Sequence, residues 1–231
     1  MSDENIGPAV VVHGGAGAEK TLEDGCRIAA QAAINALARG GQALQAAVAA
    51  VVVLEDDGRF NAGSGSELGL DGVTIEMDAS VMDTRGKLGA VACIQNVRNP
   101  VLVARAVADT PHCLMAGDGA MRLARALGHQ PFYSATDEAR KNHAEMIGKL
   151  ESEKPAMPGV GNEEFLRYWN YAVPSAFRNR AACDTVGAVA RDAGGHFAVA
   201  GSTGGSAPSL LGRVGGTALV GRGYYAGPHG A

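Results

Sequence analysis

The chain is poor in the residues that mark several large classes of protein. Aromatic residues make up only 5% of its 231 residues, and tryptophan occurs once. The net charge is −4 and no basic stripe is visible, so nucleic acid is not expected as a partner. The four cysteines (Cys26, Cys93, Cys113 and Cys183) show no CxxC spacing, which argues against a zinc site or a redox dithiol. We interpret them as scattered, buried thiols of a cytosolic protein.

Long apolar runs are missing too. The apolar run at residues 46–54 is too short to span a membrane. The polar residues 1–8 have no apolar core of a signal peptide, so we expect a cytoplasmic protein without membrane contact. What the chain does contain is 46% hydrophobic residues and 33 glycines. This composition predicts a sizeable core with many tight backbone turns.

Hydrophobic patterns and turn residues predict both strands and helices. Strands are expected at residues 9–13, 73–82, 88–95, 185–191, 196–200 and 218–225. Helices are expected at residues 22–39, 42–55, 119–127 and 137–150, and after Asn99-Pro100, where proline suits the first helical turn. Hairpins dominate the second half, which favours an α+β fold with mixed antiparallel sheets over βαβ winding. Prolines and glycines predict an exposed linker from residue 151 to about residue 184.

The first candidate for chemistry is Thr185, at the start of a predicted strand and directly after the linker. If the Asp184–Thr185 bond is cut, Thr185 gains a free α-amino group beside its own hydroxyl. That amine can act as the base that activates the hydroxyl, which is otherwise a poor nucleophile at neutral pH. The alternative is a structural threonine, because threonine is common at the start of strands.

Two later segments could complete such a site. A hairpin between residues 185–191 and 196–201 would bring Thr203 back beside Thr185, where its hydroxyl could hydrogen-bond the nucleophile. Arg213 stands between glycines and is well shaped to grip a carboxylate with two parallel hydrogen bonds. The alternatives are a plain polar turn after residue 201 and a solvated surface arginine.

Other polar residues give weaker signals. His13 precedes the glycine-rich residues 14–17 and could be a base, a ligand or a structural histidine. The glycine stretch is not a phosphate loop, because it lacks the lysine and hydroxyl of that motif. Glu76 and Asp78 share one face of a predicted hairpin that also holds Asp83, but no histidine or further carboxylate completes a metal site.

Eight short motifs follow one another in a fixed order. They are residues 13–17 (HGGAG), 60–65 (FNAGSG), 76–83 (EMDASVMD), 89–92 (GAVA), 98–101 (RNPV), 184–190 (DTVGAVA), 202–205 (STGG) and 212–215 (GRVG). Outside the linker, this series resembles the plant-type asparaginase/isoaspartyl peptidase family of N-terminal-nucleophile hydrolases over nearly the whole chain. Gly204 favours this branch over the related glycosylasparaginases, which usually have asparagine at that position.

The resemblance implies a single domain with a four-layer αββα fold, made as an inactive precursor that cuts itself between Asp184 and Thr185. Residues 1–184 would form the α subunit and residues 185–231 the start of the β subunit, and two such heterodimers would pair. The implied substrates are L-asparagine, hydrolysed at its side-chain amide, and β-aspartyl (isoaspartyl) dipeptides.

The resemblance also implies roles for single residues. Thr185 corresponds to the nucleophile, Thr203 to the threonine that assists it, and Arg213 to the arginine that binds the substrate α-carboxylate. Asn61 corresponds to an asparagine close to the nucleophile, and Gly204 and Gly205 belong to the substrate site. No cofactor for catalysis is implied. A structural sodium ion would be held by main-chain carbonyls of Leu54, Glu55, Asp57, Phe60, Ala62 and Ser64.

The chain departs from the family pattern at two places. Gly216 stands where the family has an aspartate that grips the substrate α-amino group, and losing such a charge-assisted contact costs about 1.5–3 kcal/mol of binding. The chain ends at residues 227–231, before the Thr-Gly-x-Gly segment that supplies the oxyanion hole in the family. The resemblance therefore implies a domain incomplete at its C-terminus. A shortened chain, a separate complementing polypeptide and a loss of catalysis are the alternatives.

Overall fold

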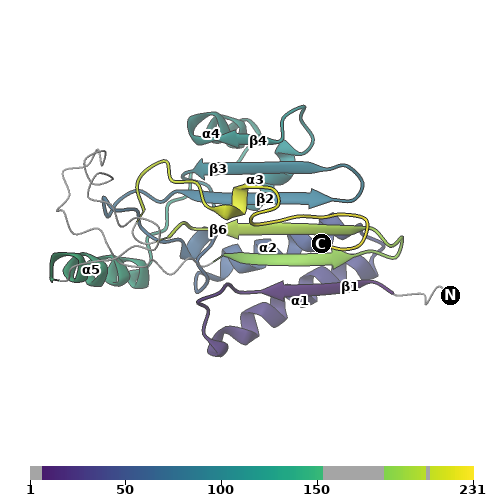
Figure 1. Cartoon of the computed structure of the whole chain (residues 1–231), viewed down its shortest axis with the longest axis horizontal. Helices are drawn as coiled ribbons and strands as arrows, with labels where there is room; N and C mark the ends of the chain where they lie inside the picture. The colour runs from purple at the N-terminus through teal and green to yellow at the C-terminus, as the bar shows by residue number, and fades with distance from the viewer. Residues whose placement is uncertain (1–6, 153–184, 207–208) are drawn as a thin grey trace.

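The computed structural model describes residues 7–152, 185–206 and 209–231. Its centre is a six-stranded sheet with the strand order β1-β5-β6-β2-β3-β4 (Figure 1). All neighbouring strands are antiparallel except β3 and β4, which are parallel. The strands are β1 (Ala9–His13), β2 (Met77–Asp83), β3 (Leu88–Ile94), β4 (Leu114–Ala116), β5 (Val186–Arg191) and β6 (Phe197–Thr203).

Helices cover one face of this sheet. The α-helices are α1 (Glu23–Ala38), α2 (Ala43–Asp57), α3 (Pro100–Val107), α4 (Gly117–Ala126) and α5 (Asp137–Ser152). Three short 3₁₀ turns are η1 (Lys20–Leu22), η2 (Gly63–Gly65) and η3 (Gly216–Ala218). In Figure 1, α1, α2 and α3 lie behind the sheet, and the C-terminal segment with η3 crosses its front.

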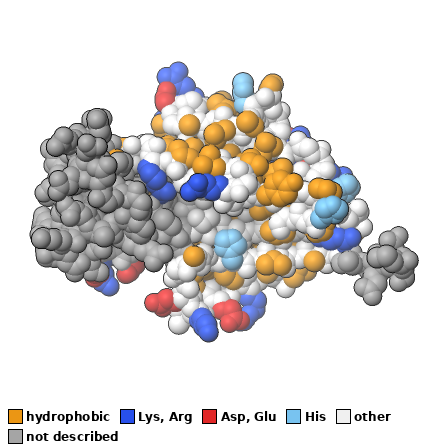
Figure 2. Space-filling view, in the orientation of Figure 1, with side chains coloured by type: hydrophobic (Ala, Val, Ile, Leu, Met, Phe, Trp, Pro, Cys, Tyr) orange, Lys and Arg blue, Asp and Glu red, His pale blue; other side chains and the backbone are white. Residues whose placement is uncertain are grey.

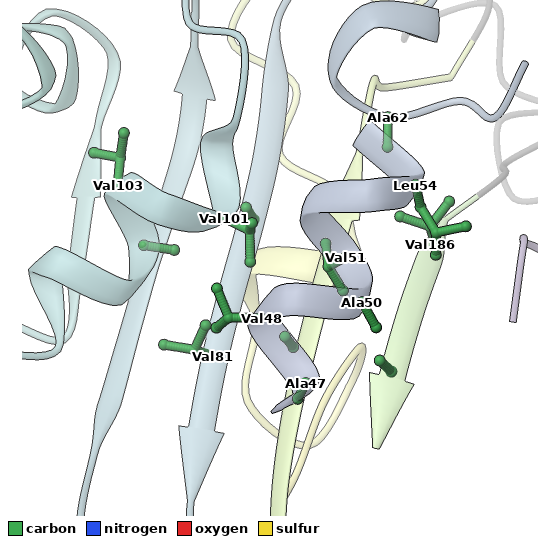
Figure 3. Close-up of a cluster of buried hydrophobic side chains, with 14 of the residues drawn as sticks. Ala47, Val48, Ala50, Val51, Leu54, Ala62, Val81, Val101, Val103 and Val186 are labelled. Carbon is green, nitrogen blue, oxygen red and sulfur yellow. The ribbon is translucent and has the colours of Figure 1, made fainter. Parts of the chain in front are cut away.

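The main core lies between the sheet and these helices. Small residues of α2 face the strands and are fully buried, so the helix lies close to the sheet. Figure 3 shows Val48, Val51 and Leu54 of α2 beside Val81, Val101 and Val186. At Gly89 a side chain would overlap the backbone of α3, so only glycine permits this approach of α3 to β3.

Most of the predicted elements are confirmed, including the hairpin of β5 and β6 and the proline in the first turn of α3. The strand predicted at residues 73–82 begins only at Met77. Val73 and Thr74 instead donate their N–H groups to the Asp71 carboxylate in a turn. The three-residue strand β4 was not predicted, because it is too short to show a hydrophobic pattern.

The strand predicted at residues 218–225 is wrong. The segment follows η3 with turns and contains only an isolated bridge between Val220 and Tyr224. Gly221 has a φ of 75° and its N–H donates to the Tyr224 carbonyl, so the backbone reverses where a strand would continue. The pattern of apolar residues in this stretch is also typical of a strand, which is why the prediction was wrong.

Within the described residues, the structure contains one helical layer and one sheet, and the four-layer sandwich stays a prediction. The same part of the chain contains no helix that is long and apolar enough to cross a membrane.

Candidate active site

Thr185 directly precedes β5, and the strand register brings it to Thr203. Val186 pairs with Ser202 and Gly187 with Gly201, so the same register continued by one residue sets Thr185 opposite Thr203. Thr203 in turn pairs with Asp78 of β2. Because opposite residues share a face, these side chains belong to the sheet face that the helices leave open. The predicted approach of Thr203 to Thr185 is therefore present in the backbone register.

A residue that the sequence analysis did not select makes the hydroxyl contact to Thr185. Thr185 Oγ1 lies 3.3 Å from Thr217 Oγ1, and either atom can be the donor. Thr217 belongs to η3, which crosses the open face, and is 4% exposed. The only signal in the sequence is its position soon after the Gly-Arg-Val-Gly motif.

Small residues form the sheet surface beside the threonines. Gly187 and Gly201 pair directly in the next row, and the His13 ring lies over Gly187, where a side chain would overlap it. The hydroxyl of Ser80 is buried and lies 3.8 Å from the place that a Cβ of Gly201 would occupy. Within the described structure this hydroxyl has no hydrogen-bond partner. The open face thus presents small residues and polar groups beside the two threonines.

Two carboxylates hold the loop that carries Arg213. The N–H of Gly212 donates to Glu76 Oε2 at 2.6 Å, and the N–H of Gly215 donates to Asp78 Oδ2 at 2.7 Å. Burial raises the pKa of Asp78, although it accepts N–H groups and faces the charge of Arg213. The described residues contain no cluster of His, Cys, Asp or Glu able to hold a metal ion. Glu76 and Asp78 therefore act as anchors of the loop.

Arg213 lines a pocket and has the Asp78 carboxylate as an electrostatic neighbour. Its Nε is buried without a hydrogen-bond partner, and no described carboxylate forms an ion pair with it. Its Nη atoms lie 3.8 Å and 2.9 Å from the places that Cβ atoms of Gly205 and Gly215 would occupy. The pocket is lined by Arg213 together with Glu67, Gly69, Thr74, Glu76, Gly204, Gly205, Ser209, Leu210 and Leu211. The guanidinium is the group here that could grip a carboxylate, but the space is only about 10 Å³ and Glu67 and Glu76 also line it.

Asn61 fastens the turn after β6. Its Nδ2 donates to the Gly205 carbonyl at 2.7 Å, and its own carbonyl accepts the N–H of Gly204 at 2.9 Å. A side chain at Gly204 would overlap Asn61 Oδ1 and the backbone of Ser66. These contacts explain why glycine stands at 204, and they place Asn61 against the residues that follow Thr203.

Gly216, the first residue of η3, brings no charge to the site. A Cβ at this position would lie 3.6 Å from the Arg222 Cγ, which is an ordinary van der Waals contact. Its φ is not in the left-handed region. A side chain therefore fits here, so crowding does not explain why this sequence lacks the aspartate.

The last turn of α2 and the loop after it carry the main-chain oxygens that the sequence analysis assigned to sodium. The carbonyls of Phe60, Ala62 and Ser64 accept hydrogen bonds from Ala62 N–H, Gly65 N–H and the Ser134 hydroxyl. A second lone pair remains on each oxygen. Leu54, Glu55 and Asp57 lie in the last turn of α2, and Gly63 approaches the Glu55 carbonyl closely. Oxygen donors of this kind are what hard cations prefer, so the residues fit a sodium ion chemically.

Glu55 has a second feature that the sequence did not indicate. Its side chain is fully buried, and Oε1 accepts the N–H of Val101 at 3.0 Å. Burial raises its pKa to about 8, although the hydrogen bond from Val101 and the nearby polar groups of Ser202 and Asn99 oppose the shift. Burial therefore favours the neutral form of Glu55, on the covered side of the strand that ends in Thr203.

The remaining sequence predictions concern the linker, the cleavage site and the cysteines. Asp184, Cys183 and most of the expected linker lie outside the described residues. Of the other cysteines, Cys93 is buried and Cys26 half-buried, but Cys113 is exposed, so the prediction of buried thiols is wrong for Cys113. Burial raises the pKa of Cys26, and raises that of Cys93 to about 11, which makes both poor nucleophiles.

Comparison with known proteins adds independent findings. The family model described as asparaginase matches residues 6–231. The chain is 42% identical to a plant-type L-asparaginase of Thermococcus kodakarensis, over 94% of this chain and 70% of that protein. It is similarly 42% identical to a plant-type L-asparaginase of Pyrococcus furiosus, over the same shares. It is 38% identical to an isoaspartyl peptidase/L-asparaginase of Bos taurus, over 96% of this chain and 68% of that protein.

Proposed function

The chain belongs to the asparaginase family that includes plant-type asparaginases and isoaspartyl peptidases, and on this premise we propose a self-processing hydrolase with Thr185 as its nucleophile. The observation that carries the proposal is the place of the Thr185 hydroxyl. It directly precedes β5, opposite Thr203 and against Thr217, on the open face of the sheet. Its proposed substrates are L-asparagine and β-aspartyl dipeptides.

Activation begins with cleavage of the chain itself. Thr185 Oγ attacks the carbonyl carbon of Asp184, a C–O bond forms and the peptide C–N bond breaks. The hydroxyl proton passes to the released nitrogen, which becomes the α-amine of Thr185. Water then hydrolyses the ester, which leaves a carboxylate on Asp184 and restores the Thr185 hydroxyl. The product is a nucleophile with its base on the same residue.

Turnover repeats this acyl transfer on the substrate. The Thr185 amine takes the hydroxyl proton while Oγ attacks the side-chain carbonyl, and the proton passes to the leaving ammonia or amino acid. Water then attacks the acyl ester and releases aspartate. Thr203 hydrogen-bonds the nucleophile, and its fixed register on β6 supports this role.

Arg213 provides substrate recognition in this proposal. Its guanidinium, on a loop held by Glu76 and Asp78, binds the substrate α-carboxylate. Gly204 and Gly205, held by Asn61, form the neighbouring wall of the pocket. Because Gly216 offers no carboxylate, the substrate amino group is held more weakly than in a site with aspartate at that position.

Three further parts of the proposal concern the assembled protein. The main-chain carbonyls of residues 54–64 hold a structural sodium ion. The processed protein adopts the four-layer αββα sandwich and pairs as a dimer of heterodimers. Membership in the asparaginase family motivates the fold and the pairing, and the sodium ion rests on the carbonyls of the loop after α2.

The decisive experiment measures the intact mass of the purified chain during incubation at neutral pH, beside a Thr185→Ala control. We expect two fragments separated between Asp184 and Thr185, and no fragments from the control. The processed protein should then release aspartate from L-asparagine and from a β-aspartyl dipeptide. Activity restricted to glycosylated asparagine would instead indicate a glycosylasparaginase.

The departure at Gly216 favours a second candidate, a catalytically silent binding protein that keeps the site. This alternative predicts an uncut chain that still binds L-aspartate in isothermal titration calorimetry. Binding should then be lost in Arg213→Met. Clean self-cleavage of the unmodified chain would exclude it.

A further inference from the structure

We propose that Thr217 is a positioning residue for the Thr185 hydroxyl, a role that rests on the proposed function of Thr185. The sequence analysis did not select Thr217, which lies between the Gly-Arg-Val-Gly motif and the strand predicted at residues 218–225. The inference comes from its contact, its burial and the rigidity of the turn that carries it.

The contact joins the two hydroxyls directly. Thr185 Oγ1 and Thr217 Oγ1 are 3.3 Å apart, and Thr217 is 4% exposed. This distance is longer than the optimum of about 2.7–2.8 Å for O–H···O bonds. Long hydrogen bonds are common in catalytic sites without ligand and shorten when the reacting complex forms.

The backbone around Thr217 leaves it little freedom. The N–H of Leu219 donates to the Gly216 carbonyl at 2.8 Å, and the N–H of Gly223 donates to the Leu219 carbonyl at 3.1 Å. A side chain at Gly223 would overlap the Gly216 carbonyl, so the turn folds back tightly on itself. Thr217 is thus presented from a fixed backbone.

The sheet surface fixes the rotamer of Thr217 from the other side. Its Cγ2 lies 3.7 Å from the place that a Cβ of Gly201 would occupy, so the methyl group packs over this glycine. Because β-branched side chains have few χ1 rotamers, packing of the methyl group also sets the direction of the hydroxyl. The direction leads to Thr185.

The chemistry of the uncut chain shows which step the contact between the two hydroxyls can assist. Before cleavage, the nitrogen of Thr185 is a peptide nitrogen and is not basic, so the hydroxyl lacks its later base. Thr217 is an alcohol and is too weak a base to remove the proton. Its hydrogen bond instead selects the rotamer in which Thr185 Oγ can attack, both in cleavage and in turnover.

The test compares Thr217→Val, which keeps the shape and removes the hydroxyl, with Thr217→Ser, which keeps the hydroxyl. A neutral hydrogen bond contributes about 0.5–1.5 kcal/mol, so we expect Thr217→Val to slow self-cleavage by roughly three- to tenfold or more. Thr217→Ser keeps the hydroxyl but lacks the methyl group that sets its direction, so it should be slowed less than Thr217→Val. Thr110→Val is the matched control, because its hydroxyl bonds the Val107 carbonyl away from the site and its loss should not change the rate.

A second measurement does not depend on cleavage. Thr185→Cys is prepared with and without Thr217→Val, and alkylation of position 185 is followed against pH by peptide mass spectrometry. This readout separates the new thiol from the four native cysteines. Donation from Thr217 stabilises the thiolate, so removing the hydroxyl should raise the pKa of this thiol by about one unit.

The outcomes separate the two proposals. An uncut unmodified chain together with a shifted thiol pKa would contradict self-processing and support the role of Thr217. Unchanged cleavage and an unchanged thiol pKa in Thr217→Val would overturn that role. A rate for Thr217→Ser as low as that of Thr217→Val would also overturn it, because the hydroxyl would then contribute nothing.

Discussion

On the face of the sheet that α1, α2 and α3 cover, the strands present valine and alanine, and on the opposite face the same strands present threonine, serine, glycine and aspartate. Val186, Ala188 and Ala200 belong to the covered core. Gly187 and Gly201 alternate with them on the open face, where Thr185 also makes its contact to Thr217. Because successive side chains of a strand point to opposite faces, the buried core lies on one face of the sheet and the candidate site on the other.

The open face is not uniformly polar. Val199, Tyr224 and Ala226 form a second, small cluster there, with Met82, Leu88 and Val189 packed against it. Figure 2 shows hydrophobic side chains gathered on this side of the molecule. The helical face carries most of the buried apolar area, so we expect stability to depend mainly on it and function mainly on the other.

The largest expected effect tests this division by stability. Leu54→Ala removes a fully buried side chain between α2 and β5 and should lower the free energy of unfolding by about 2–5 kcal/mol. Val11→Ala shortens a side chain on the open face that is 68% exposed. This variant should change the free energy of unfolding by less than about 0.5 kcal/mol. Urea unfolding of both variants measures the difference. Equal losses would show that the open face is as important to stability as the covered one.

A smaller effect comes from Glu55, a fully buried acid on the covered side of the sheet. The pKa of Glu55 is about 8 in the folded protein and 4.5 without burial, so the folded state holds the proton more tightly. Its contribution to stability is complete below about pH 4.5 and is lost progressively as the pH rises to about 8.

Glu55→Gln keeps an acceptor for the Val101 N–H and removes the titration. We expect the variant to lose less stability than the unmodified protein between pH 5 and about 8, by up to about 1.4 kcal/mol per pH unit. Thermal melting across this range measures the two slopes. Parallel slopes would mean that Glu55 is already ionised in the folded protein.

The smallest effect concerns ligand binding on the open face. Gly216→Asp places a carboxylate where space exists, and should strengthen binding of L-aspartate by up to about tenfold. Succinate, which has the carboxylates but no amino group, should gain nothing. Calorimetric titration of both ligands compares them. Equal gains for both would show that the new carboxylate does not contact the amino group.

Local patterns were sufficient for much of the fold. The helices at residues 23–38 and 43–57 and the hairpin of β5 and β6 follow from hydrophobic period and turn residues close together in the chain. The same reasoning failed at residues 218–225. There, apolar residues pack as a turn over the sheet, and backbone hydrogen bonds around Gly221 and Gly223 decide the conformation.

The candidate site, like the fold, could be predicted from the sequence only in part. Thr185, Thr203 and Arg213 could be selected from motifs, because each stands beside glycines or at the start or end of a strand. Glu76 and Asp78 were noticed as a pair on one face, but their contacts to Gly212 and Gly215 were not foreseen. The raised pKa of Glu55 could not be predicted either, since it depends on how deeply α2 packs against the sheet.

The sequence by itself determined the class of fold, the family and the candidate nucleophile, because these depend on local periodicity and on motifs that keep their order along the chain. Only the tertiary structure decided that β1 lies beside β5 and that Thr217 meets Thr185. Both contacts join segments far apart in the chain. Which distant segments meet depends on how the strands pair and how the turns pack over them. This is decided only when the whole chain packs.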